Sequence, residues 1–227
     1  REAGATKPLI AVVTGGSPMN LTEVHEIADA VLLIWYPGEE GGNAVADIIF
    51  GKASPSGKLP LTFPKSIDQL PAYEDYSMEG RTYRYMTSEP MYPFGFGLSY
   101  TKFEYSNLKL ASNKIRKNKP VDAEITITNT GTVAGDEVAQ LYITDLKASV
   151  RAPLFSLKDF KRVNLKPGES KTLKFTITPD MMMLVNDNGE QVLEPGEFKI
   201  AVGSSLPTKR SQDLGAPVHQ EAMFSVR

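Results

Sequence analysis

The spacing of apolar residues changes near residue 100, and this change limits the folds that the 227-residue chain can adopt. Before that point, short apolar runs alternate with stretches whose apolar residues recur every three or four positions, as in amphipathic helices. After it, apolar and polar residues alternate one by one, as in strands that are buried on one face. We therefore predict an α/β region followed by an all-β region.

Two continuous apolar runs, residues 9–13 and 31–36, dominate the first region, and each is followed by glycine or proline. Such runs are typical of parallel strands covered by helices on both faces. Helical spacing follows each run, and Asn20 or Thr22 is the expected cap of the first helix. Residues 1–70 are therefore predicted to be the C-terminal part of an α/β three-layer sandwich with a mostly parallel sheet. Because so few strands cannot bury such a sheet, we expect it to be truncated at its N-terminal side.

Residues 103–227 carry the alternating pattern, which is clearest over residues 121–128. Pro-Gly pairs at residues 167–168 and 195–196 mark turns between the alternating segments. About seven strands of this kind predict a β-sandwich. Between the two regions, residues 71–102 are rich in proline and aromatic side chains, so we expect an ordered linking loop rather than a free linker.

Composition excludes several classes of function. The net charge is −2 and no basic stripe is present, which argues against a nucleic-acid partner. No apolar run is long enough for a membrane span. The chain has no cysteine and only two distant histidines, so we expect no metal site, and no glycine-rich stretch has the spacing of a nucleotide loop. No cofactor is predicted.

Several segments closely resemble glycoside hydrolase family 3 enzymes of the β-glucosidase type. They are the signature-like run Trp35-Tyr36-Pro37-Gly38 through Gly51, its continuation over residues 54–64, the junction Tyr92-Pro93-Phe94-Gly95 through Tyr100, and residues 129–142, 158–162 and 194–198. The resemblance runs in the family's order over nearly the whole chain. It implies that the β-sandwich is of the fibronectin type III-like kind, and that Met181 to Met183 lie in a strand and fill gaps against it.

The resemblance also implies a function. Family 3 enzymes hydrolyse β-linked glycosides with retention, using an aspartate nucleophile on an N-terminal barrel and a glutamate acid/base early in the α/β domain. Neither motif is found here, so we assign no catalytic residue and expect the chain alone to be inactive. The expected partners are the barrel domain of the same enzyme and a β-linked oligosaccharide, with a homodimer possible. The resemblance to this family, together with the absence of cysteine, implies a periplasmic or secreted location.

Glu39 and Glu40 are adjacent acidic residues and are therefore candidates for a pair of catalytic carboxylates. Adjacent residues point apart, whereas retaining hydrolysis needs two carboxyl groups roughly 5 Å apart across a sugar. Their position before Gly41 and Gly42 favours a role at a turn and a helix N-terminus instead.

Four residues of the linking loop are candidates for substrate binding: Arg81, Tyr83, Arg84 and Tyr92. Aromatic faces stack on sugar rings and guanidinium groups bind hydroxyls in a forked manner, and this loop is dense in both. The alternative is that the tyrosines seal a domain interface while the arginines pair with neighbouring acids.

Two other classes of function stay open. A β-sandwich also occurs in non-catalytic carbohydrate-binding or interaction modules, since a fold does not fix a function. Such a module requires exposed aromatic side chains, yet the predicted strands place mostly Thr, Lys and Glu outward. A structural spacer is the third interpretation.

Overall fold

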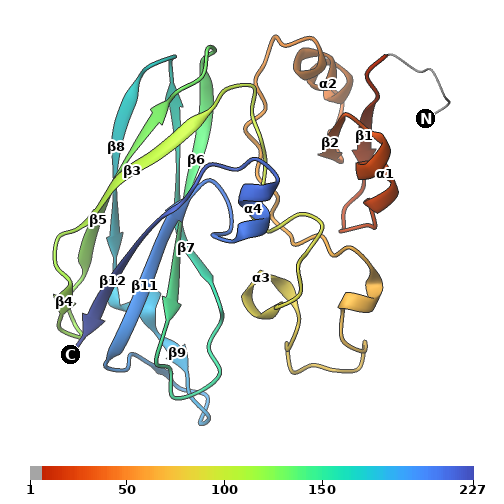
Figure 1. Cartoon of the computed structure of the whole chain (residues 1–227). Coiled ribbons are helices and arrows are strands. Elements are labelled where there is room, and N and C mark those ends of the chain that lie inside the picture. Colours follow the sequence, from red (N-terminus) through yellow and green to blue (C-terminus); the bar gives the residue numbers. More distant parts are fainter. Residues whose placement is uncertain (1–6) are drawn as a thin grey trace.

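A computed structural model describes residues 7–227 (Figure 1), so residues 1–6 of the predicted α/β region lie outside the described part. A β-sandwich forms one half of the molecule, and residues 7–102 lie along one side of it. The change in hydrophobic period therefore coincides with a change in architecture. The first sandwich strand begins at Phe103.

The α/β part consists of one parallel strand pair and two helices. Strands β1 (Ile10–Thr14) and β2 (Ala30–Trp35) are parallel, and α1 (Thr22–Ile27) lies between them in sequence. Helix α2 (Gly41–Ile49) follows, and Gly51 closes its end with φ of 72°. The pair is two-stranded within residues 7–227, and the other sheets are antiparallel or mixed. The predicted mostly parallel sheet is therefore not confirmed beyond this pair.

Neither expected side chain caps α1. The N-cap residue is Leu21, whose side chain cannot accept a hydrogen bond, and Thr22 is already the first helical residue. Asn20 instead accepts a hydrogen bond from the backbone N–H of Thr22 at 3.0 Å, which forms a turn before the helix. The buried Leu21 side chain fixes where this helix starts, and tertiary packing has overridden the capping preference.

Eight strands in two sheets build the sandwich, in agreement with the predicted architecture (Figure 1). One sheet has the order β4-β12-β11-β6-β7 and the other has the order β3-β5-β8. Their bounds are β3 (Phe103–Leu110), β4 (Lys114–Ile115), β5 (Val121–Asn129), β6 (Gly135–Asp145), β7 (Ser156–Leu165), β8 (Ser170–Ile177), β11 (Gly196–Gly203) and β12 (Gln220–Val226).

The sandwich core follows from the alternation in sequence. Ile125, Ile127, Phe175, Leu141 and Ile200 all have 0% exposure. They come from both sheets, and the polar residues between them in sequence face away from this core. Full burial of one such side chain contributes roughly 1.5–3 kcal/mol, so this core supplies most of the driving force for the sandwich.

Two predictions about the segment after β8 can be checked. Residues 181–183 do not form the strand that the resemblance implies: η2 (Pro179–Met182) is a 3-10 helix, because Pro179 pre-sets its first turn. Met182 is nevertheless buried in the sandwich core, as a gap-filling methionine would be. The following hairpin, β9 (Leu184–Val185) and β10 (Gln191–Val192), turns at Gly189 with φ of 80°.

The linking segment is ordered and packed. It contains η1 (Ile67–Gln69) and α3 (Thr82–Tyr85), and Phe63 and Tyr92 form an isolated antiparallel bridge within it. These two aromatic side chains belong to a second, smaller core together with parts of α1 and β2. Helix α4 (Lys209–Asp213) holds this segment from the sandwich side, since the Arg210 guanidinium donates to the Met91 carbonyl at 3.0 Å.

Candidate functional site

A groove of about 780 Å³ lies between the first part of the chain and the linking segment. Its walls come from residues 18–20, residues 60–70, residues 78–86 and Phe94, and most of the side chains are apolar. Arg81, Tyr83 and Arg84 border the groove, so the structure brings together three of the four predicted substrate-binding residues. Tyr92 is not among the lining residues.

Arg81 organises the loop in front of this groove. Its Nη2 donates to the backbone carbonyls of Ala72 and Asp75, each at 2.8 Å. Two guanidinium bonds to backbone across the loop hold residues 72–81 in one compact shape. The side chains of Tyr73 and Tyr76 remain 85% and 83% exposed on the loop.

The acids of this loop have partners other than Arg81. Glu79 pairs with Arg151 at 3.0 Å, a contact from the loop to the sandwich. The backbone N–H of Ser77 donates to Asp75, and this bond, followed by one from the Ser77 hydroxyl, lowers the pKa of that carboxyl. The expected pairing of the loop arginines with these neighbouring acids is therefore not observed within residues 7–227: Arg81 donates to backbone carbonyls, and Glu79 pairs with Arg151 instead.

The backbone is strained on both sides of Arg81. Met78 has φ of 63° and Thr82 has φ of 52°, and the side chains of both line the groove. A left-handed conformation is unfavourable for a β-branched residue and costs on the order of 1–3 kcal/mol. Strain of this kind is typical of segments whose exact shape serves a binding function.

Tyr83 and Arg84 join α3 to the sandwich. The Tyr83 ring stacks on Phe94 with centroids 4.1 Å apart, and its hydroxyl accepts a hydrogen bond from the Leu157 N–H at 3.2 Å. The backbone carbonyl of Arg84 accepts from the Leu154 N–H at 2.7 Å. Both residues thus border the groove and also contact the sandwich. The predicted substrate-binding role and the predicted interface role therefore each describe only part of their contacts.

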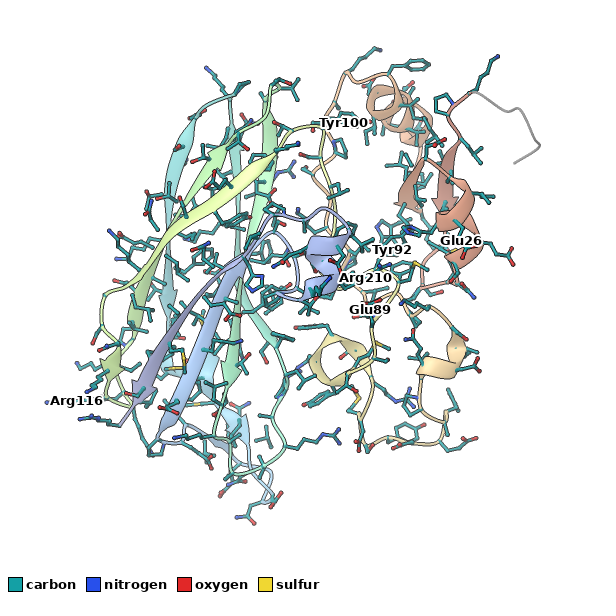
Figure 2. All side chains as sticks on the ribbon, in the orientation of Figure 1. Glu26, Glu89, Tyr92, Tyr100, Arg116 and Arg210 are labelled. Carbon is teal, nitrogen blue, oxygen red and sulfur yellow. The ribbon has the colours of Figure 1, made fainter. Side chains whose placement is uncertain are left out.

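Tyr92 lies behind the groove wall. It is buried, its ring packs against Phe63 and Phe96, and its hydroxyl lies 2.9 Å from Nδ1 of His25. Burial raises the pKa of the Tyr92 phenol, and the nearby Arg210 opposes this effect. Figure 2 shows Tyr92 close to Arg210 where the first half of the chain meets the sandwich. Its contacts are those of a packing residue that supports the wall.

A buried charged cluster that the sequence patterns did not predict lies at the junction of the two halves. Glu137 on β6 lies 3.2 Å from the Lys58 ammonium, and the Tyr105 hydroxyl donates to the same carboxylate oxygen at 3.1 Å. The Lys58 ammonium also donates to the Gly97 carbonyl at 2.9 Å. Burial raises the pKa of Glu137, and Lys58 is the strongest opposing influence. The sequence contained a signal for this cluster, because Glu137 is an acidic residue at an inward position of an alternating strand.

Glu39 and Glu40 take no part in the groove. Both are exposed, and a Glu40 carboxylate oxygen accepts a hydrogen bond from the Asn43 side chain at 2.5 Å. Glu40 is the N-cap residue of α2 but makes no side-chain bond to the helix backbone. Their position beside the N-terminus of α2 is as predicted, and the expected capping bond is absent at this end of the helix.

The placement of acidic and histidine side chains and the length of the helices in residues 7–227 bear on two further functions. No group of three or more His, Asp or Glu side chains in this part of the chain is arranged to hold a metal ion. None of the helices in the same range is both long and apolar enough to cross a membrane.

Comparison with known proteins gives the family. Residues 2–100 match the glycosyl hydrolase family 3 C-terminal domain, and residues 137–206 match the fibronectin type III-like domain. The chain belongs to glycosyl hydrolase family 3 and corresponds to its C-terminal part.

Similar proteins include glycosidases with different named substrates. The chain is 43% identical over 203 residues to a putative beta-xylosidase of Formosa agariphila and covers 27% of that protein, with 88% of its own length matched. It is 41% identical over 209 residues to a periplasmic beta-glucosidase of Salmonella typhimurium, matching 87% of its own length and 27% of the relative's.

A solved structure with the same fold is the beta-D-glucoside glucohydrolase of Trichoderma reesei. The TM-score is 0.84 at 30% identity, over 99% of this chain and 34% of that one. The chain thus spans about a quarter to a third of the length of the relatives that it matches.

Proposed function

We propose that this chain is the C-terminal portion of a retaining β-glycosidase that removes terminal β-linked glucose from oligosaccharides. In this proposal its role is to support the catalytic site and to form part of the substrate pocket. The aspartate nucleophile and the glutamate acid/base come from the rest of the enzyme, the first from its barrel domain. The chain alone is then inactive.

One observation carries the proposal that this chain completes a larger domain: within residues 7–227 the β1–β2 pair has no further strand on either edge, and apolar residues in and beside it are exposed. Leu9, Ile10 and Val12 are 41%, 39% and 42% exposed, although apolar parallel strands are normally covered on both faces. Exposed apolar surface of this kind marks an interface with further protein. The partial coverage of the relatives' length supports the same interpretation.

The proposed role of each part follows the domain boundaries predicted from the sequence. Residues 1–70 complete the α/β sandwich domain, residues 71–102 link the two domains and shape the groove, and residues 103–227 form the fibronectin type III-like domain. Because the Glu79–Arg151 pair and the Lys58–Glu137 pair cross between these parts, the sandwich would hold the groove loop in position.

The four candidate residues act in two ways in this proposal. Arg81 and Arg84 border the groove and are proposed as sugar contacts, and Arg81 also holds the loop that carries Tyr73 and Tyr76. Tyr83 and Tyr92 position that wall, since both rings pack against other aromatic side chains.

The deciding experiment compares this chain, the full-length enzyme and the N-terminal remainder in an aryl β-glucoside assay. The expected result is turnover by the full-length enzyme and none by the chain alone. Hydrolysis by the isolated chain would refute the proposal and return attention to Glu39 and Glu40. An aryl β-xyloside measured in parallel tests the sugar, because similar proteins carry both beta-glucosidase and beta-xylosidase names.

In the full-length enzyme, Arg81→Ala is expected to raise the Michaelis constant for di- and trisaccharides more than that for an aryl glucoside. Loss of both loop-closing bonds releases Tyr73 and Tyr76, whereas the proposal places the reacting sugar ring outside this loop. Arg116→Ala, an exposed arginine at the far end of the sandwich in Figure 2, is the matched control. Unchanged constants for all three substrates in Arg81→Ala would remove this loop from the substrate pocket.

A non-catalytic carbohydrate-binding or interaction module is the second candidate, and the exposed Tyr73 and Tyr76 favour it. It requires saturable binding of gluco-oligosaccharides by the isolated chain, with loss of binding in a Tyr73→Ala and Tyr76→Ala double variant. We further propose a periplasmic or secreted location, and a homodimer as one possible assembly. Cell fractionation and light scattering of the full-length enzyme test these two points.

A further inference from the structure

A second cavity, of about 180 Å³, lies between α3 and the end of the sandwich. Of the residues that line it, Arg84 also lines the groove. Residues 151–158 form one side and residues 181–185 form the other. Figure 1 shows α3 beside the sandwich on this side of the molecule. The walls combine apolar side chains such as Ile143, Phe198 and Met182 with several charged groups.

The charged groups of this cavity are unbalanced. Arg84, Arg151 and Lys158 contribute three positive charges, against one carboxylate, that of Asp145. Asp145 already accepts the backbone N–H of Lys147 at 2.9 Å. The cavity therefore has an excess of cations.

Two of the three cations have no acidic partner in the part of the chain that the structure describes. Arg151 pairs with Glu79, whose side chain is 71% exposed. Within residues 7–227, neither the Lys158 ammonium nor the Arg84 guanidinium forms an ion pair or a side-chain hydrogen bond. The Arg84 and Arg151 guanidiniums both lie over the ring of Tyr85, at 5.8 and 5.6 Å from its centroid. This shared ring keeps the two planar cations at the same edge of the cavity.

Lys158 is the most informative of these groups. Its side chain is partly buried, and burial, together with the positive charge of Arg84, lowers the pKa of its ammonium. Partial burial of a cation without an anion is unfavourable. An anion in the cavity would relieve both effects, because it would compensate the desolvation of Lys158 and the repulsion between the two cations.

We propose that this cavity binds a small organic carboxylate, with its carboxylate between Lys158 and Arg84 and its hydrocarbon body against Met182 and Phe198. Guanidinium and ammonium donors suit a carboxylate, and charge-assisted bonds of this type are the strong ones. The apolar wall distinguishes this ligand from an inorganic anion, since methionine sulfur packs well on aromatic or aliphatic groups. The volume equals that of about six water molecules at roughly 30 Å³ each, which suits a ligand of the size of benzoate.

The test is a titration of the chain with benzoate, followed by calorimetry and by NMR of the methionine methyl groups. Saturable binding with shifts confined to the Met181 to Met183 methyls is expected. Benzyl alcohol, a neutral ring of the same size, and inorganic phosphate, an anion without an apolar body, are expected to bind at least about tenfold more weakly, because each lacks one half of the recognition.

Matched variants place the site. Lys158→Met is expected to weaken benzoate binding at least about tenfold. Lys161→Met, on the same strand and with its ammonium over the Phe175 ring instead, is expected to leave it unchanged. Arg84→Met, at an exposed position, provides a second variant whose folding is not at risk, and it is expected to weaken binding as well because it removes the other cation that contacts the carboxylate. Equal binding of benzyl alcohol or phosphate, an equal effect of Lys161→Met, or shifts of other methionines would overturn the proposal.

Discussion

The buried pair of Lys58 and Glu137 gives the sharpest prediction, because it connects the two halves of the molecule and carries charge. The two side chains are only 13% and 3% exposed, and the Nζ–Oε1 distance is 3.2 Å. Lys58→Met keeps most of the alkyl chain and removes the charge, which leaves the Glu137 carboxylate buried without its cation. Breaking a buried pair on one side typically costs about 3–5 kcal/mol, so we expect a loss of this size at pH 7.

The pH dependence of this loss follows from the pKa of Glu137. Burial raises the pKa of Glu137 above its usual value. The group therefore contributes to the free energy of unfolding when it is protonated. This contribution is fully present below the unfolded pKa and is lost as the pH rises through the folded pKa. Lys58 opposes the rise, so its removal raises the folded pKa further. The difference in stability between the variant and the original chain should therefore be small near pH 4 and reach its full size only at neutral pH.

Urea unfolding followed by far-UV circular dichroism at both pH values measures this difference. Lys52→Met is the matched control, because the Lys52–Asp47 pair is 74% and 47% exposed and such pairs contribute about 0–1 kcal/mol. The double variant Lys58→Met with Glu137→Gln should recover much of the loss. An equal loss at both pH values, or a loss no larger than that of the control, would refute the argument that a buried charge dominates at this junction.

Three other substitutions test the packing and the electrostatics. Phe63→Ala should destabilise the chain by about 3–5 kcal/mol, since the ring has 0% exposure, and the change should alter the fluorescence of the neighbouring Trp35. Gly95→Ala should cost at least about 1–2 kcal/mol in a thermal melt, because Gly95 has φ of 74° and a methyl group would meet the buried side chain of Gln140; an unchanged melting temperature would contradict this. Asp136 has a pKa lowered by the hydrogen bond from Asn164 and then by the one from Arg162, so its contribution to stability exists above the unfolded pKa and is lost as the pH falls. Asp136→Asn should flatten the acid limb of the stability profile, and an unaltered limb would exclude that role.

The groove shows why sequence reasoning located its residues but could not assign their contacts. Composition alone pointed to Arg81, Tyr83, Arg84 and Tyr92, and three of them border one groove. Which of them faces the groove and which packs behind it depends on the path of the linking loop. That path is fixed by contacts such as Arg81 with the Ala72 carbonyl, whose partner no local pattern identifies.

The β-sandwich, the two apolar strands of the first region and the positions of the turns could be predicted from the sequence, because alternation, apolar runs and Pro-Gly pairs are local signals with direct structural meaning. Other features depend on tertiary packing. The start of α1 at Thr22, the 3-10 helix at residues 179–182 and the burial of Glu137 beside Lys58 each depend on segments that are distant in sequence. Contacts of this kind are set by the packing of whole elements, which reverses local preferences whenever burial contributes more free energy than a cap or a strand propensity.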